Sequence, residues 1–351
     1  MRTLKMEFLV VVVIASMQFC MTTSAHQGPD CNIRQYSYYT NLAEMAITHS
    51  DYSKALVYYD SAADFIHSPF ATDRYNTSVC NAILGNYNTC RTEVLSLFGK
   101  GLSKEVIRNN KAFAGFLTSE YGKGILEQKV EPTYNVSLRK LYDSIYAVDQ
   151  MSVRKHIAMG TDDYDDVLFK MDVSNIKALN KLIATYGWPT EDLLGINELG
   201  FQQYETIIIN QKHSKHQVYN FTDDIRNAHQ QGLIESHKAL FLISMANGTD
   251  EANNSEAGQV TIVYDSLGVY HAGNLSAFKH KTGFYPLKEN RASIEMQRQQ
   301  YGVEPIDDFR AKVLLSLKDD RFCFRYDGAK TTYAICYLSE YEYAAKRLIG
   351  I

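Results

Sequence analysis

The sequence predicts a mainly α-helical protein, in which a helical-repeat domain is followed by a second mostly helical domain with one or two small β-hairpins. Three observations predict this fold class. Apolar and small residues recur at helical spacing through most of the chain, and the two short stretches with a strand pattern lie near its end, at 260–270 and 322–337. Apolar residues make up 45% and charged residues 22% of the chain, which is typical of globular proteins and excludes a disordered one.

The first 25 residues have the pattern of a secretory signal peptide. Arg2 and Lys5 precede the uncharged run 8–21, and small residues stand before a cleavage site after Ala25. This run is shorter than the roughly 20 residues that cross a bilayer as a helix, and no later segment approaches that length without charges. We therefore expect a secreted or periplasmic mature chain without a transmembrane helix.

The cysteines favour neither lipidation nor a metal site. Lipoprotein processing at Cys20 is disfavoured because Phe19 occupies a position that needs a small residue. The remaining five cysteines are Cys31, Cys80, Cys90, Cys323 and Cys336. Their odd number leaves at least one free thiol or an intermolecular pair, and the pairing of the first three stays open.

Charge and motifs exclude several classes of function. The formal net charge is −4 and no stretch is dense in Lys and Arg, so nucleic acid is not expected as a partner. The chain has no P-loop, no G-x-S-x-G elbow, no G-x-G-x-x-G and no H-E-x-x-H motif. The acidic run 162–166 lacks calcium-loop spacing and predicts a solvated loop. No cofactor or metal is expected, and the oligomeric state stays open.

Residues 38–65 predict two helices that are broken at 49–51. The packing positions of this helix-turn-helix unit are Leu42, Ala43, Ala46, Tyr52, Ala55, Tyr59 and Ala62. Their spacing resembles that of a tetratricopeptide repeat, which implies that Ala55 and Ala62 are buried between helices. A second unit covers 75–98 with its turn at 85–87, and 103–126 supply a third, poorer unit or a cap. Such stacks commonly hold peptides or partner helices in a concave groove, and the alternative is a rigid spacer without a ligand.

The helical pattern breaks at 130–133, where we place a domain boundary. The repeat domain is then 26–130, a helical domain of unknown function is 134–311, and a β-hairpin and helix extension is 312–351. Helices are predicted in the second domain at 137–156, 172–186, 196–209, 222–229 and 233–245.

The second domain resembles a bacterial domain family of unknown function that often follows tetratricopeptide-like segments in secreted proteins. The matching residues are Asp149, Gln150 and Arg154, then Asp172, Asn175, Leu179, Ile183 and Gly187-Trp188-Pro189, then Ile208, Ile209, His213 and Gln217. The segment 286–306 is similar to the closing segment of that family. The chain departs from the pattern after Leu240, where an Asp-Arg pair is absent, and at the polar insertion 247–258.

The resemblance implies a candidate site in the second domain. Its catalytic candidates are Asp149, Arg154 and His213, and its ligand-binding candidates are Gln150, Trp188 and Gln217. If these groups converge, the carboxylate would orient the imidazole, the guanidinium could hold an anion and the indole would exclude water. The alternative is a buried polar network that only stabilises the helices. The other clustered histidines, His216, His229 and His237, are expected at the surface or partly packed.

Two short β-hairpins are predicted near the end of the chain. One pairs 260–264 with 269–270 around Gly268, and the other pairs 322–326 with 333–337 around Asp327 and Gly328. In the second hairpin Cys323 and Cys336 would stand symmetrically about the turn, which predicts a cross-strand disulfide.

Two functions from different classes follow from these patterns. The favoured one is a secreted or periplasmic binding or scaffold protein that uses the helical-repeat groove for a protein or peptide partner. The alternative is an enzyme, possibly a hydrolase, with a polar site around Asp149, Arg154, Trp188 and His213. A pocket lined by these four side chains would favour the enzyme, whereas their dispersal would leave the groove.

Overall fold

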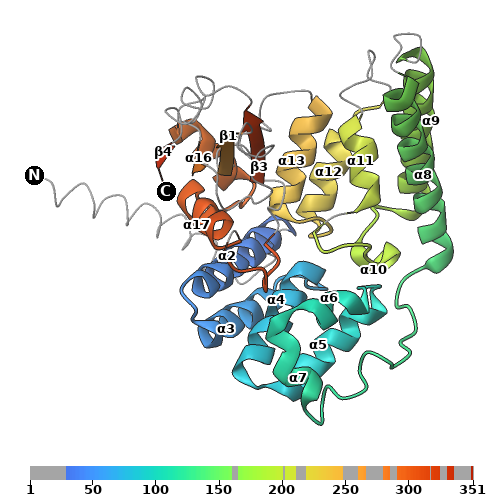
Figure 1. The fold of residues 1–351 in the computed structure, drawn as a ribbon. Helices are drawn as coiled ribbons and strands as arrows, with labels where there is room; N and C mark the ends of the chain where they lie inside the picture. Colours follow the sequence, from blue (N-terminus) through green and yellow to red (C-terminus); the bar gives the residue numbers. More distant parts are fainter. Residues whose placement is uncertain are drawn as a thin grey trace, which may run out of the picture.

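The structure is a computed structural model (Figure 1). It describes residues 29–159, 165–200, 202–210, 219–247, 260–265, 280–284, 291–316, 318–324, 330–335 and 349–350. These residues form a mainly helical fold with one small sheet, in agreement with the predicted class. The signal segment 1–25 lies outside the described residues.

Two helical hairpins open the described chain. Their helices are α2 (Pro29–Thr48), α3 (Tyr52–Ala63), α4 (Ala71–Leu84) and α5 (Tyr87–Gly99). The side chain of Asp51 accepts a hydrogen bond from the backbone N–H of Lys54 and so caps α3 at the predicted turn. Gly85 ends α4 with a φ of 77°, which glycine adopts without strain. Ala55 and Ala62 are buried, at 0% and 1% exposure.

The segment after the second hairpin is not a third hairpin of the same size. It folds into the short helices α6 (Lys104–Asn109), η1 (Lys111–Phe113) and α7 (Ala114–Thr118). Asn110 ends α6 and its side-chain oxygen accepts a hydrogen bond from the Ala112 N–H, so the chain turns there. Phe113 and Phe116 are fully buried, and these short helices therefore close the end of the core.

Longer helices build the second half. They are α8 (Val136–Met159), α9 (Asp165–Tyr186), α10 (Glu191–Leu194), α11 (Gln203–Asn210), α12 (Thr222–Gln230) and α13 (Ser236–Asn247). Figure 1 shows α8 and α9 packed along each other at one edge of the molecule. The helix expected at 196–209 begins only at Gln203, because Gly195 and Gly200 have positive φ values of 69° and 76° that end helical geometry.

The C-terminal part returns to the first two hairpins. Helices α16 (Arg291–Gln300) and α17 (Ile306–Ser316) are followed by a non-helical segment up to 324. Phe309, Phe322 and Phe324 belong to the same hydrophobic core as the residues of α3, α4 and α5. In addition, the Lys312 Nζ atom lies 2.6 Å from Glu44 Oε2. The segment 306–324 is therefore part of the N-terminal core, although it follows the second half in sequence.

The strands β1 (Val260–Asp265), β2 (His280–Phe284), β3 (Lys330–Ile335) and β4 (Ile349–Gly350) form a sheet in the order β3-β1-β2-β4. β1 pairs with β2 antiparallel and with β3 parallel. The stretch 269–270, expected to pair with β1, lies outside the described residues.

The second predicted hairpin is wrong. Residues 322–324 are not a strand, because Phe322 and Phe324 are buried in the helical core, and β3 pairs instead with β1. The expected Cys323–Cys336 disulfide thus loses its cross-strand basis, and Cys336 lies outside the described residues.

Candidate functional site

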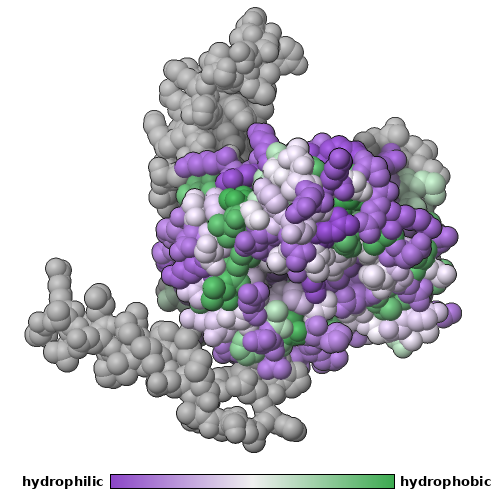
Figure 2. Space-filling model, turned by 90° about the horizontal axis from the view of Figure 1, so that it is seen from below, coloured by the Kyte–Doolittle hydropathy of each residue, from purple (hydrophilic) through white to green (hydrophobic). Residues whose placement is uncertain are grey.

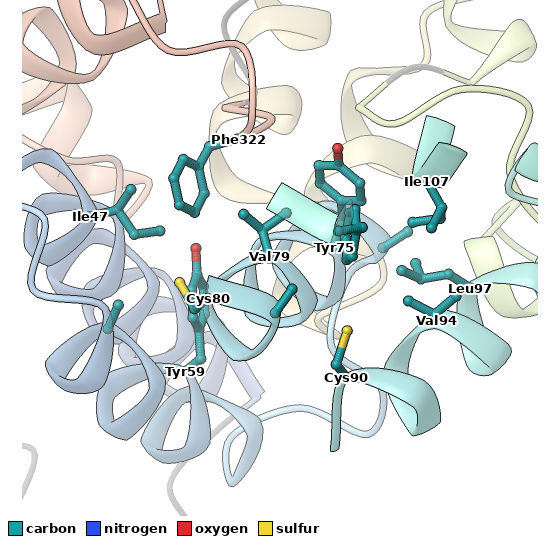
Figure 3. Close-up of a cluster of buried hydrophobic side chains, with 14 of the residues drawn as sticks. Ile47, Tyr59, Tyr75, Val79, Cys80, Cys90, Val94, Leu97, Ile107 and Phe322 are labelled. Carbon is teal, nitrogen blue, oxygen red and sulfur yellow. The ribbon is translucent and has the colours of Figure 1, made fainter. Parts of the chain in front are cut away.

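A segment without helix or strand, which bends at 321 and 322, lies across the two helical hairpins. We call residues 319–324 the strap. The strap site consists of Tyr52, Asn76 and Asn110, which contact the strap, and of Tyr75, whose hydroxyl accepts a hydrogen bond from Asn110. Figure 3 shows Phe322 pointing into the space between Ile47 of α2 and Val79 of α4. The first two helical hairpins therefore contact a segment of the same chain that lies far away in the sequence.

Asn76 recognises the backbone of the strap. Its Nδ2 atom donates to the carbonyl oxygen of Cys323 at 2.8 Å, and its Oδ1 atom accepts from the Cys323 N–H at 2.9 Å. Asn76 is completely buried. One amide side chain thus satisfies both polar groups of one strap residue, which would otherwise be costly to bury.

Asn110 holds the strap two residues earlier. Its Nδ2 atom donates to the Arg321 carbonyl oxygen at 2.7 Å and to the Tyr75 hydroxyl at 2.6 Å. Both asparagines contact main-chain atoms of the strap, so this part of the recognition depends little on the side chains of the bound segment.

The side chains of the strap supply the specific contacts. Phe322 stacks on Tyr52 with ring centroids 5.7 Å apart, and it stacks on Phe324 at 6.2 Å. Arg321 donates to the Tyr52 hydroxyl at 3.1 Å and to both carboxylate oxygens of Asp319. These hydrogen bonds lower the pKa of Asp319, so the pair is charged at neutral pH and fixes the conformation of the strap.

Asp149, the first catalytic candidate, is buried in a polar cluster between α8, α9 and α11. Its carboxylate accepts hydrogen bonds of 2.9 Å from Gln150 Nε2 and from Asn210 Nδ2. Burial, and then the charge of Asp149, raise the pKa of Asp172 to about 6. The structure thus joins Asp149 to Gln150 and to Asn210 by hydrogen bonds, and Asp172 lies near enough for the charge of Asp149 to act on it. Asn210 is not among the residues that the resemblance indicates.

Among the described residues, no hydrogen bond or ion pair links Arg154 to this cluster. Its side chain is exposed and lines an open hollow of about 550 Å³. The hollow is also lined by Asp143, Tyr146, Ala147, Gln150, Met151 and Gln203. Gln150 is therefore the residue that links the hollow to Asp149.

Trp188 lies elsewhere. It is 7% exposed and packs edge-on against Tyr204 at 5.6 Å, next to Tyr142 in the core of the second half. Asp149 follows Tyr142 on α8 by about 10 Å along the helix axis at 1.5 Å per residue. Trp188 therefore stabilises the helix packing and does not line the hollow.

The structure describes two of the four clustered histidines, His229 and His237. His213, His216 and Gln217 lie outside the described residues. His237 is partly packed, as expected, and stacks on Phe309 at 5.4 Å. His229 is only 3% exposed and its Nε2 atom lies 2.9 Å from Ser236 Oγ, so the expectation that it is a surface or partly packed residue is wrong. Across the ranges that the structure describes, no group of His, Cys, Asp and Glu could hold a metal ion.

A buried charge cluster connects the two halves of the chain. Glu191 accepts a hydrogen bond of 2.7 Å from the first N–H of α4, at Ala71, and Lys238 Nζ lies 2.8 Å from Glu205 Oε1. Burial raises the pKa of both Glu191 and Glu205. Burial opposes the charge of Lys238 as well, but the carboxylates of Glu205 and Glu235 raise its pKa overall. This cluster fixes the hairpins against the second half.

The chain matches no model of a known protein family, no curated protein and no solved structure. In the part of the chain that the structure describes, no helix has both the length and the apolar character needed to cross a membrane. The face seen in Figure 2 carries mostly hydrophilic residues, with separate small hydrophobic patches among them. That face offers no broad apolar docking surface.

Proposed function

We propose that this protein is a binding or scaffold protein whose first two helical hairpins, of the tetratricopeptide-like type, hold a peptide segment of a partner. The observation that carries the proposal is the Asn76 side chain, which binds the N–H and the C=O of Cys323 in the strap. Every peptide offers such backbone groups, so a segment of another chain can present the same two groups to Asn76.

The partner segment needs a backbone free of helix and strand pairing and two aromatic side chains separated by one residue, as in the strap. The backbone contacts of Asn76 and Asn110 supply affinity, and the contact of Phe322 with Tyr52 selects an aromatic residue. Aromatic side chains bury a large area for few rotatable bonds, which makes such a short motif sufficient for specific binding.

A peptide selection tests this proposal. The bait is the mature chain with Arg321→Ala, which removes the hydrogen bonds of Arg321 to Asp319 and to the Tyr52 hydroxyl and so weakens the hold of the site on the strap. Selection from a library of eight-residue peptides should enrich aromatic-x-aromatic sequences.

Asn110→Ala in the bait should weaken binding of the selected peptides at least tenfold. The matched control Asn88→Ala, at an exposed position of α5, should leave binding unchanged. No enrichment, or equal binding by both variants, contradicts the proposed function.

A second candidate function is a small-ligand or hydrolytic site at the hollow beside α8. It is favoured by two observations. Burial and the charge of Asp149 raise the pKa of Asp172 to about 6, and Gln150, which donates a hydrogen bond to Asp149, lines the hollow together with Arg154. Such a carboxyl can exchange a proton near neutral pH. A thermal-shift screen of small anions with Arg154→Gln and with the control Lys140→Gln, at an exposed position of α8 outside the lining of the hollow, tests it. Loss of a ligand-induced shift only in Arg154→Gln supports this function, and the absence of any shift contradicts it.

We further propose that residues 1–25 direct the chain to the secretory or periplasmic compartment and are removed after Ala25, and that the second half belongs to the secreted bacterial family that it resembles. The charged start, the apolar run and the small residues before His26 support the first part. Mass spectrometry of the protein from the native host should give His26 as the first residue. An intact Met1 would contradict secretion.

A further inference from the structure

We infer that the strap is an internal ligand of the strap site and that a partner binds by displacing it. This inference rests on the proposed function, since it assumes that the strap site accepts segments of other chains. It goes further because it assigns the current occupant of the site and the form of regulation that follows from it.

The first argument is the way in which the strap is held. Its backbone is bound by the side chains of Asn76 and Asn110 rather than by a strand or helix ladder. The strap therefore contacts the site in the way that a bound peptide does, and a peptide in solution can make each of these contacts equally well.

The second argument is the position of the strap in the chain. It lies between α17, which ends at Ser316, and β3, which begins at Lys330. Helix α17 has its own anchors on α2, namely the Lys312–Glu44 ion pair and a 2.8 Å hydrogen bond from Asn41 Nδ2 to Asp308 Oδ2. The strap can leave its site while α17 keeps these anchors, because none of them involves residues 319–324.

The third argument is quantitative. A tethered segment competes at an effective concentration on the order of millimolar. The apparent affinity of a partner in solution is then its affinity for the open site multiplied by the fraction of molecules whose site is open. Weakening the strap without touching the site should then strengthen partner binding. Arg321 suits this purpose because it contacts Asp319 and Tyr52 and leaves the two asparagine contacts in place.

The chemistry of the displacing partner follows from the strap itself. It is a protein segment without helix or strand that has aromatic residues at two positions separated by one. An arginine precedes them and pairs with an acidic residue two positions earlier, as in Asp319, Arg321, Phe322 and Phe324.

The experiment uses the mature chain and an eight-residue peptide with the sequence of 318–325, in which Cys323→Ser prevents oxidation. The control peptide carries Phe322→Ala and Phe324→Ala. Affinity is measured by fluorescence anisotropy for the unmodified chain and for Arg321→Ala. Hydrogen exchange is followed at the Cys323 N–H, which donates to Asn76 in the closed state.

We expect Arg321→Ala to bind the peptide at least tenfold more tightly than the unmodified chain, and the control peptide not to bind. At a saturating peptide concentration, the rate of hydrogen exchange at the Cys323 N–H of the unmodified chain should rise at least tenfold. If only Arg321→Ala binds the peptide, the same rise is expected in that variant. Equal affinity for both chains, or binding without faster exchange at Cys323, overturns the internal-ligand inference but leaves the proposed function standing. No binding to either chain overturns this inference, while the library selection decides the proposed function separately.

Discussion

Lys312→Met should destabilise the fold strongly, because it leaves buried carboxylates without their cation. Lys312 and Glu44 are 0% and 1% exposed, and Lys312 Nζ lies 2.6 Å from Glu44 and 3.4 Å from Glu304. The buried residues Lys312, Arg298, Glu44 and Glu304 carry no net charge together, and the substitution leaves one net negative charge. Breaking a buried ion pair by removing one partner costs about 3–5 kcal/mol.

The double variant Glu44→Gln/Lys312→Met restores neutrality and should recover part of this loss, so that its free energy of unfolding falls by about 1–3 kcal/mol relative to the unmodified chain. The assay is urea denaturation of the mature chain at pH 7, followed by circular dichroism. The control Lys318→Met removes an exposed lysine near the end of α17 and should change the unfolding free energy by less than about 0.5 kcal/mol. The reasoning is refuted if the single and double variants lose the same stability, or if Lys312→Met matches the control.

Three further predictions concern packing, proton binding and thiol reactivity. Ala55→Leu should overpack the contact between the helices of the first hairpin and lower stability by roughly 1–3 kcal/mol; an unchanged melting temperature would contradict this packing. The pKa of Asp172 is about 6 in the folded chain, whereas its ordinary value is 3.8. Between these two pH values the folded state keeps a proton that the unfolded state releases, so the free energy of unfolding should fall as the pH rises from 4 to 6. Asp172→Asn should remove that dependence and stabilise the chain at pH 7 by about 1–2 kcal/mol after solvent screening, and equal pH profiles for both chains would refute this. Burial raises the pKa of Cys80 and Cys90 to about 12, so Ellman's reagent should modify neither thiol at pH 8 until denaturant is added; rapid modification of the native chain would show that they are accessible.

Local signals account for the parts of the fold that the sequence predicts well. The first two hairpins follow from apolar spacing and from the turns at 49–51 and 85–87, where Asp51 and Gly85 act within their own segments. Helices α8 and α9 follow from the same spacing. Each of these elements is decided by residues within a few turns of one another, and a single sequence contains that information.

The strap could not be predicted because its partners are distant in sequence. Asn76 and Cys323 are 247 positions apart, and no pattern in either segment indicates the other. The apolar alternation of Phe322 and Phe324 fits a strand as well as an extended segment in a helical core, which is why a hairpin was expected there. Likewise, the partner of β1 is set by long-range pairing with 280–284 and 330–335.

The sequence indicates only some of the residues that meet around Asp149. Asp149 and Gln150 are neighbours on α8 and do meet in one polar cluster. Trp188 was expected to converge with them, but a tryptophan beside a Gly and a Pro also suits a buried helix end, and here it packs on Tyr204. The choice between these two roles depends on how α8 and α11 cross, which the spacing of residues along one helix does not specify.

Photo-crosslinking tests most directly whether the strap site binds peptides. The peptide with the sequence of 318–325 carries benzoylphenylalanine in place of Phe322 and is irradiated with the Arg321→Ala chain, and the attachment site is mapped by mass spectrometry. Binding at the strap site predicts crosslinks to α2, α3 or α4, near Ile47, Tyr52 or Val79, and their loss in excess unlabelled peptide. Crosslinks confined to α8–α13, or none that unlabelled peptide suppresses, would contradict it.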